Sequence, residues 1–313
     1  MTMTRPDATI IICTYNRCRS LSHTLASFDR LDTRGIDVEV VLVDNNSCDD
    51  TRAVFDSWHR KSPLPARYLF EQRQGLSFAR NAGVEKARGD IVAFTDDDVT
   101  VDGAWIKQLV TGIRASGAAA GGGKILPAWP GPVPSWLTED LHGYLALLDL
   151  GDEPRIMDEP RLYGANFAVQ RDWMKRHRFS TSLGRVGTSL RVGEDTALLA
   201  DIAEQGGALF YCPHAVVRHR IEEWRLTKSY FRRWHTELGQ MQGELFDENH
   251  PRTLCGVPFR VYREILEHSF ELGKAACLRR PVFPHELELR RLVTAMYAGM
   301  RRNLSTPRLR SFA

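Results

Sequence analysis

The fold is decided by the stretch Ile91-Val92-Ala93-Phe94-Thr95-Asp96-Asp97-Asp98. Its first part is an unbroken apolar and β-branched run, which is typical of a strand covered on both faces. Two similar runs, Thr9–Cys13 and Val38–Val43, also end in polar residues. Because ligands bind at the carboxyl ends of strands in open α/β sheets, we expect these polar residues to form one site.

Helical spacing of apolar residues separates these runs, and the alternation predicts an α/β fold with a mostly parallel mixed sheet flanked by helices. The predicted strands are 9–13, 38–43, 67–70, 91–95, one near Ile125, Leu162–Val169, 208–211 and 215–217. The predicted helices lie around 21–31, 54–58, 76–88, 105–113 and Glu194–Glu204, and the sequence is helical after Ile221.

Composition and hydropathy argue against a disordered, a membrane-spanning and a secreted protein. The 313 residues are 43% hydrophobic with a net charge of +3, as in an ordinary globular chain. No apolar run reaches the ~18 residues of a membrane-spanning helix, and the N-terminus lacks a secretory signal, so we expect a cytoplasmic protein. The 6 cysteines lack C-x-x-C spacing and are expected to be reduced, buried thiols.

Residues 251–313 form a basic tail, with 12 Lys and Arg against 5 Asp and Glu. This tail favours either peripheral contact with anionic lipid at the cytoplasmic face of a membrane, or packing against the rest of the protein or a second subunit. It contains no motif that reads nucleic acid, and we expect no nucleic-acid partner.

Asp96, Asp97 and Asp98 are candidate metal ligands. Adjacent carboxylates repel one another unless a cation neutralises them, and carboxylate oxygens suit Mn²⁺ or Mg²⁺, which bridge to phosphate oxygens. In an extended segment Asp96 and Asp98 point the same way and would face one metal–diphosphate unit. The alternative is an acidic turn that caps a helix over Asp102–Ser116.

Asp44 follows a buried strand, where a carboxylate binds the ribose or base of a nucleotide or else caps a turn. No glycine-rich phosphate loop follows the first strand, because Thr14-Tyr15-Asn16-Arg17 lacks both G-x-G-x-x-G and a Walker lysine. This argues against a nicotinamide dehydrogenase and a P-loop ATPase. It suits a nucleotide held by a metal and by side chains.

Three further titratable residues have both a structural and a catalytic interpretation. Glu194 and Asp195 open a predicted helix, where carboxylates act as caps, but a general base for an acceptor hydroxyl can also lie there. His219 follows a short strand and is either a structural histidine or a ligand.

Five segments of the chain, in order, resemble motifs of the family 2 glycosyltransferases, which have a GT-A fold. They are Ile10–Arg17, Val43–Ser47, Gly75–Gly83, Phe94–Asp98 and Gly193–Asp195. The resemblance covers about Thr9–His219. It implies a GT-A catalytic domain over residues 1–222, with a nucleotide-binding half at about 7–125 and an acceptor half at about 126–222. A C-terminal helical extension, 223–313, follows.

The resemblance also implies a role for each matching residue. Asp195 would be the general base, with Glu194 as its neighbour. Mn²⁺ or Mg²⁺ would be bound by Asp98, with Asp96 and His219 as further ligands. Nucleotide and donor contacts would come from the ends of the strands, a helix start and the segment 162–166, at Thr14, Tyr15, Asn16, Arg17, Asp44, Asn46, Arg80, Asn81, Asp96, Asp97, Gly164 and Asn166.

The implied reaction is the inverting transfer of a single sugar from a nucleotide-diphosphate sugar, with uridine as the expected base. The acceptor would be a hydroxyl of a glycan, a lipid-linked molecule or a small molecule. Processive members carry Q-x-x-R-W, whereas Tyr230 stands in place of the glutamine in Tyr230–Trp234. The proline-rich segment Pro127–Leu137 is interpreted either as a lid over the donor or as a packed connection.

Two other functions are compatible with part of this sequence pattern. A sugar-nucleotide pyrophosphorylase, a nucleotidyltransferase, shares a related sheet and metal aspartates but normally opens with a glycine-rich basic loop. A non-catalytic sugar-nucleotide-binding protein would not need both the acidic triplet and Asp195.

Overall fold

The structure is a computed structural model that describes residues 5–187, 189–246 and 252–305. The chain divides into two compact units. The first unit is Met1–Gly131, Leu145–Thr188 and Val192–Glu222, and the second is Pro132–Tyr144, Ser189–Arg191 and Glu223–Ala313. The end of the basic tail, 306–313, lies outside the described residues.

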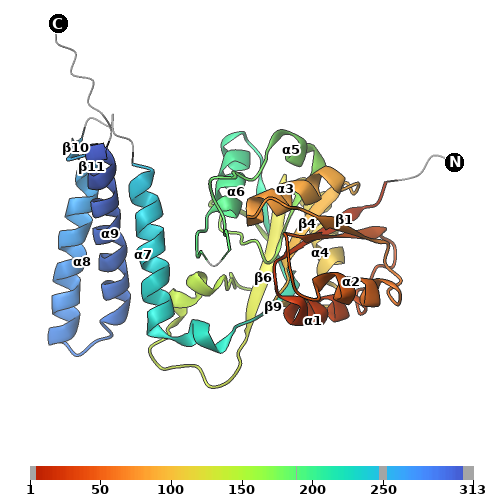
Figure 1. The fold of residues 1–313 in the computed structure, drawn as a ribbon, viewed down its shortest axis with the longest axis horizontal. Helices are drawn as coiled ribbons and strands as arrows, with labels where there is room; N and C mark the ends of the chain where they lie inside the picture. The colour runs from red at the N-terminus through yellow and green to blue at the C-terminus, as the bar shows by residue number, and fades with distance from the viewer. Residues whose placement is uncertain (1–4, 188, 247–251, 306–313) are drawn as a thin grey trace, which may run out of the picture. The chain divides into compact units, whose positions relative to one another are not determined.

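A mixed sheet with the strand order β3-β2-β1-β4-β8-β6-β9-β5 forms the centre of the first unit (Figure 1), and β7 pairs with β9. Parallel pairing joins β1 (Ala8–Thr14), β2 (Val38–Asp44), β3 (Ala66–Phe70) and β4 (Ile91–Asp96). The others are β5 (Val99–Val101), β6 (Ala120–Ala128), β7 (Arg155–Met157), β8 (Phe167–Gln170) and β9 (Leu209–Arg220). Strand β8 is antiparallel to both β4 and β6, which makes the sheet mixed as predicted.

Helices cover both faces of this sheet (Figure 1): α1, α2 and α4 lie on one side, and α3, α5 and α6 on the other. Their bounds are α1 (Cys18–Phe28), α2 (Thr51–His59), α3 (Leu76–Lys86), α4 (Trp105–Ser116), α5 (Arg171–Arg176) and α6 (Glu194–Glu204). Each longer helix buries the apolar side that its spacing predicts, as in α1, where Leu21, Leu25 and Phe28 are buried. The covered strands explain why β1 and β2 are apolar at nearly every position.

The prediction from sequence was wrong in several details of the second half of the sheet. Only the end of Leu162–Val169 is a strand, because the Asn166 side chain instead hydrogen-bonds two backbone carbonyls and ends the loop before β8. The two short strands expected at 208–217 form the single strand β9, in which Pro213 occupies a bulge opposite β6. The short strands β5 and β7 were not predicted.

The 6 cysteines are free, as expected, but Cys48, Cys255 and Cys277 are exposed. The expectation that the thiols are buried is therefore wrong for these three, which lie in loops or at a helix end rather than in the core. Cys212, in β9, is buried.

The second unit consists of α7 (Lys228–Glu244), α8 (Phe259–Cys277), α9 (Phe283–Ser305) and the hairpin β10 (Thr253–Leu254) and β11 (Val257–Pro258). Among the described residues there are also two short 3₁₀ turns, Glu139–Leu145 and Glu223–Leu226. Helices α7 and α9 approach closely, since a Cβ placed at Gly239 or Gly243 would overlap backbone carbonyls of α9. This close approach explains both glycines in a helix interior.

Trp136 of the proline-rich segment packs edge-on against Phe231 and Phe283, with ring centroids 5.4 and 5.1 Å away. Its ring is therefore part of an aromatic cluster within the second unit, as the packed-connection interpretation requires. None of the helices among the described residues combines the length and the apolar composition needed to cross a membrane.

Candidate active site

The parallel register of β1, β2 and β4 brings their polar ends together. Thr14 pairs with Asp44 across β1 and β2, and Cys13 pairs with Asp96 across β1 and β4. The loops that follow contain Asn16 and Asn46 in the left-handed region, with φ of 51° and 70°. Asparagine tolerates this backbone better than branched residues do, so both loops can turn sharply at the sheet edge.

Asp44 is buried and held by two donors. The Tyr68 hydroxyl donates to Asp44 Oδ2 at 2.5 Å, and the Ser47 backbone N–H donates to Oδ1 at 2.8 Å. Burial of the Tyr68 hydroxyl raises its pKa, and the hydrogen bond to the Asp44 carboxylate raises it further. The hydroxyl therefore stays protonated and acts as the donor. Asn45, which sequence reasoning did not single out, accepts from Gly75 N–H at 2.8 Å and so fixes the start of α3. Tyr15 is half-buried beside this edge.

The acidic triplet is a tight turn between β4 and β5, not an extended segment. Asp97 and Asp98 therefore both face the guanidinium of Arg17. Its Nη1 lies 3.3 Å from Asp97 Oδ1 and 3.1 Å from Asp98 Oδ2. Thr14 Oγ1 also donates to Asp97 Oδ2 at 2.6 Å. Burial raises the pKa of Asp97 to about 7, although Arg17 opposes that shift. Asp96, the last residue of β4, instead faces a different arginine.

His219 is buried beside Asp98. Antiparallel pairing of β5 with β9 places it opposite Val99. His219 Nδ1 lies 2.9 Å from the Leu145 carbonyl oxygen, and Nε2 lies 3.3 Å from Asp98 Oδ2. Since a carbonyl only accepts, Nδ1 is the donor there, which leaves Nε2 as the ring nitrogen that faces Asp98.

The donor set at Asp98 and His219 fits a divalent cation. Mg²⁺ and similar ions in nucleotide sites are commonly bound by one or two side chains, with substrate phosphates and water completing the shell. No group of three or more His, Cys, Asp or Glu converges on one point within the part of the chain that the structure describes. The two residues would thus provide part of the shell and leave positions for phosphate oxygens.

Arg80 links the acidic turn to the start of α6. Its side chain is 4% exposed. Nη1 donates to Glu194 Oε1 at 2.7 Å, and Nη2 lies 3.4 Å from Asp96 Oδ1. Burial raises the pKa of Glu194, while the charge of Arg80 opposes the shift. The guanidinium is therefore a buried bridge between two carboxylates.

Asp195, the neighbour of Glu194, is oriented by the backbone. Asp195 Oδ2 accepts from Gly164 N–H at 2.7 Å, and Oδ1 accepts from Thr196 N–H at 2.7 Å. A Cβ at Gly164 would overlap the Arg80 guanidinium, so only glycine lets this loop approach both residues. The half-buried carboxylate keeps lone pairs for a further donor.

Asn166 and Asn81, two residues predicted to contact the sugar donor, make hydrogen bonds that hold loops. The buried Asn166 side chain donates to the carbonyls of Lys124 and Ala215 and accepts from the Trp105 indole at 2.8 Å. Asn81 exchanges hydrogen bonds with the Phe179 backbone, at 2.9 and 3.0 Å. Both side chains therefore link separate segments of the first unit.

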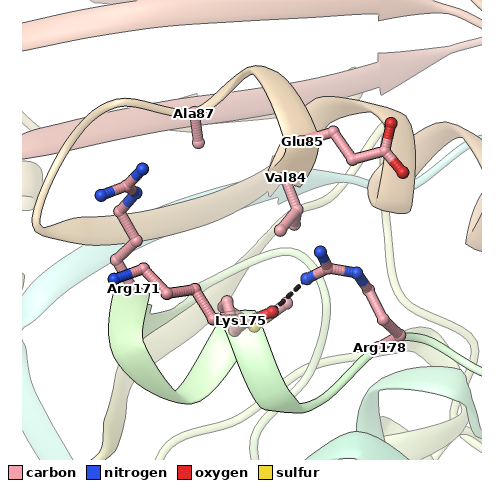
Figure 2. A pocket seen from close by; sticks show the side chains of 7 residues that line it. Val84, Glu85, Ala87, Arg171, Lys175 and Arg178 are labelled. Carbon is pink, nitrogen blue, oxygen red and sulfur yellow. Dashed lines mark hydrogen bonds between the residues drawn. The ribbon is translucent and has the colours of Figure 1, made fainter.

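A hollow in the surface lies apart from these residues (Figure 2). It is lined by the last turn of α3, by α5 and by Arg178, whose guanidinium donates to the Met174 carbonyl. Because α3 ends just before β4 begins, this hollow lies at the amino edge of the sheet, opposite the carboxyl ends that gather the site.

Comparison with known proteins shows the family to which this sequence belongs. A sequence model described as glycosyl transferase family 2 matches residues 9–176, more than half of the chain. The chain belongs to this family. The matched residues include most of β1, strands β2 to β4 and the acidic turn. As a member of this family, the protein is a glycosyltransferase.

Two relatives of this family 2 glycosyltransferase are similar to it over about three quarters and two thirds of its length. The succinoglycan biosynthesis protein ExoM of Rhizobium meliloti is 29% identical over 242 residues, covering 76% of this chain and 74% of ExoM. The glucosyl-dolichyl phosphate glucuronosyltransferase of Haloferax volcanii is 27% identical, covering 69% of this chain and 70% of the relative.

Solved structures share the GT-A fold at low sequence identity. A mannosyltransferase from Pyrobaculum calidifontis, in complex with GDP-Man and Mn²⁺, aligns with a TM-score of 0.56 and 21% identity, covering 95% of this chain and 74% of its own. GalNAc-T7 with UDP, GalNAc and Mn²⁺ aligns with a TM-score of 0.57 and 18% identity, covering 94% and 56%. Both confirm the predicted fold.

Proposed function

We propose that this family 2 glycosyltransferase moves a single sugar from a nucleotide-diphosphate sugar to an acceptor hydroxyl with inversion, assisted by Mn²⁺ or Mg²⁺, with Asp195 as general base. The observation that carries the proposal is the buried Arg80 bridge. It places Glu194, and with it Asp195, one side chain away from the acidic turn at Asp96.

The chain's own residues account for binding and for proton transfer. Asp44, held by Tyr68, would accept hydrogen bonds from the nucleoside, beside Thr14 and Tyr15. Asp98 and His219 would hold the cation, which supplies Lewis-acid stabilisation of the charge on the departing diphosphate when bound.

Asp195 would take the proton of the attacking hydroxyl, because Gly164 N–H and Thr196 N–H fix its carboxylate and leave it a lone pair for that proton. Inversion requires the base and the leaving group on opposite faces of the sugar ring, as in inverting hydrolysis. Arg17 would compensate the charge of Asp97 and Asp98 and so keep the acidic turn compact.

Uridine is the proposed base of the donor, and a glycan or lipid-linked sugar the proposed acceptor. The relatives support this acceptor class, because one takes part in succinoglycan biosynthesis and another is a glucosyl-dolichyl phosphate glucuronosyltransferase. Such acceptors place the reaction in polysaccharide or glycoconjugate synthesis. They also favour action at the cytoplasmic face of a membrane, reached through the C-terminal helices.

A donor panel tests the proposal. Purified protein is mixed with UDP- and GDP-sugars, and release of nucleoside diphosphate is measured with Mn²⁺, with Mg²⁺ and after EDTA. We expect release from a UDP-sugar with either cation and a loss of at least tenfold after EDTA, because the leaving charge then lacks its counter-ion. Equal release with and without metal would contradict the metal-assisted mechanism.

A further inference from the structure

Large apolar side chains are exposed along the outer face of α8. Phe259, Leu266 and Phe270 are 53%, 72% and 71% exposed. Their spacing of seven and four residues places them on one side of the helix, and Leu278, 53% exposed, follows the helix end. We call these four residues the α8 stripe.

The opposite side of α8 is also apolar, because it packs within the second unit. Val261 is buried in a small core with Val257 and Leu292, and Ala275 is buried near the other end of the helix. A helix at the surface of a globular unit normally has one apolar side. An additional exposed apolar side of this kind marks an interaction surface.

Basic residues border the stripe. Arg263 and Lys274 project from the same side of α8, and Arg279 and Arg280 follow Leu278; all four are exposed. Glu267 and Glu271 pair with Arg263 and Lys274, at 3.3 and 3.4 Å. Arg279 and Arg280 make no ion pair with any residue that the structure describes. The border is therefore net positive.

This combination favours an anionic lipid surface over a second copy of the chain. Apolar side chains enter the boundary between headgroups and acyl chains, while Arg and Lys extend to the phosphates. In a symmetric dimer built on the stripe, the net-positive borders of the two copies would instead meet at one interface, and like charges at an interface are unfavourable. Charge complementarity thus identifies the membrane.

We infer that the α8 stripe and its basic border dock the enzyme on a membrane containing anionic phospholipid. The inference rests on the proposed function in one respect, since a lipid-linked acceptor gives docking its purpose. Docking itself needs neither donor nor catalysis, so the two can fail separately.

Vesicle co-sedimentation of the full chain tests the inference, without donor or acceptor. We expect binding to vesicles rich in phosphatidylglycerol and much weaker binding to pure phosphatidylcholine. The variant Leu266→Glu/Phe270→Glu should bind these vesicles roughly tenfold more weakly or worse, because it places negative charge at the boundary of the acyl chains. The matched control Ile156→Glu, a 52% exposed apolar position on β7, should bind as the parent does.

A second variant separates charge from insertion. Arg279→Gln/Arg280→Gln should weaken binding to anionic vesicles by roughly 30-fold at low salt, at about 1 kcal/mol per charge. Equal binding of parent and Leu266→Glu/Phe270→Glu would overturn the inference. So would a parent dimer that this variant converts to monomer while neither binds vesicles, since the stripe would then join two copies.

Discussion

Replacing Asp195 by Asn is expected to lower sugar transfer by about 10³-fold while leaving the fold and donor binding intact. The amide oxygen of Asn still accepts from Gly164 N–H, so the loop at 162–166 and the start of α6 keep this bond, while the bond from Thr196 N–H to the other oxygen is lost. The amide cannot take a proton from the acceptor hydroxyl. The loss should therefore fall on kcat, with little change in the KM for the donor.

The measurement is initial-rate transfer to the acceptor, with thermal unfolding as a check on folding. Glu204→Gln is the matched control, because it neutralises an exposed carboxylate on the same helix. It should retain parental activity. Full turnover by Asp195→Asn would remove this residue from the mechanism.

The second large effect is expected at the buried bridge. Arg80→Gln leaves Glu194 and Asp96 without their shared cation, and breaking a buried ion pair costs about 3 kcal/mol of unfolding free energy. Protonation of Glu194 limits that cost, since burial already raises its pKa. Transfer should fall at least 100-fold, on the order of a lost positioning contact, because Gly164 and Asp195 lose the surface they pack against.

A double variant distinguishes positioning from simple instability. Arg80→Met/Glu194→Met removes both charges, so most of the unfolding free energy should return. Transfer should stay low, because Asp96 and Asp195 are no longer tied together. Urea unfolding and kcat/KM are measured on all variants. Recovery of both stability and transfer in the double variant would show that the bridge only stabilises the fold.

Much of the site follows from the sequence because parallel strands impose it. Once Thr9–Cys13, Val38–Val43 and Ile91–Thr95 are identified as covered strands, the residues after them must share an edge. The helix at Glu194–Glu204 was predicted with the bounds the structure has, because its carboxylates and apolar spacing agree.

Other features depend on contacts between distant segments. The triplet was predicted to be extended, but Arg17 draws Asp97 and Asp98 to one side. The burial of Arg80 depends on Glu194, 114 residues away, and no local pattern signals such a pair. The same holds for His219, whose orientation is set by the carbonyl of Leu145.

The proposed mechanism needs a cation that is held at Asp98 and His219 and binds the diphosphate of the donor. Titration calorimetry of UDP and GDP against the parent and Asp98→Asn, with Mn²⁺ and with EDTA, tests this most directly. Mn²⁺ should tighten nucleotide binding to the parent by roughly tenfold or more. It should leave the nucleotide affinity of Asp98→Asn unchanged, because this variant lacks the bridge between protein and phosphate. Nucleotide affinity that is the same with Mn²⁺ and EDTA, or an equal Mn²⁺ effect in Asp98→Asn, would contradict it.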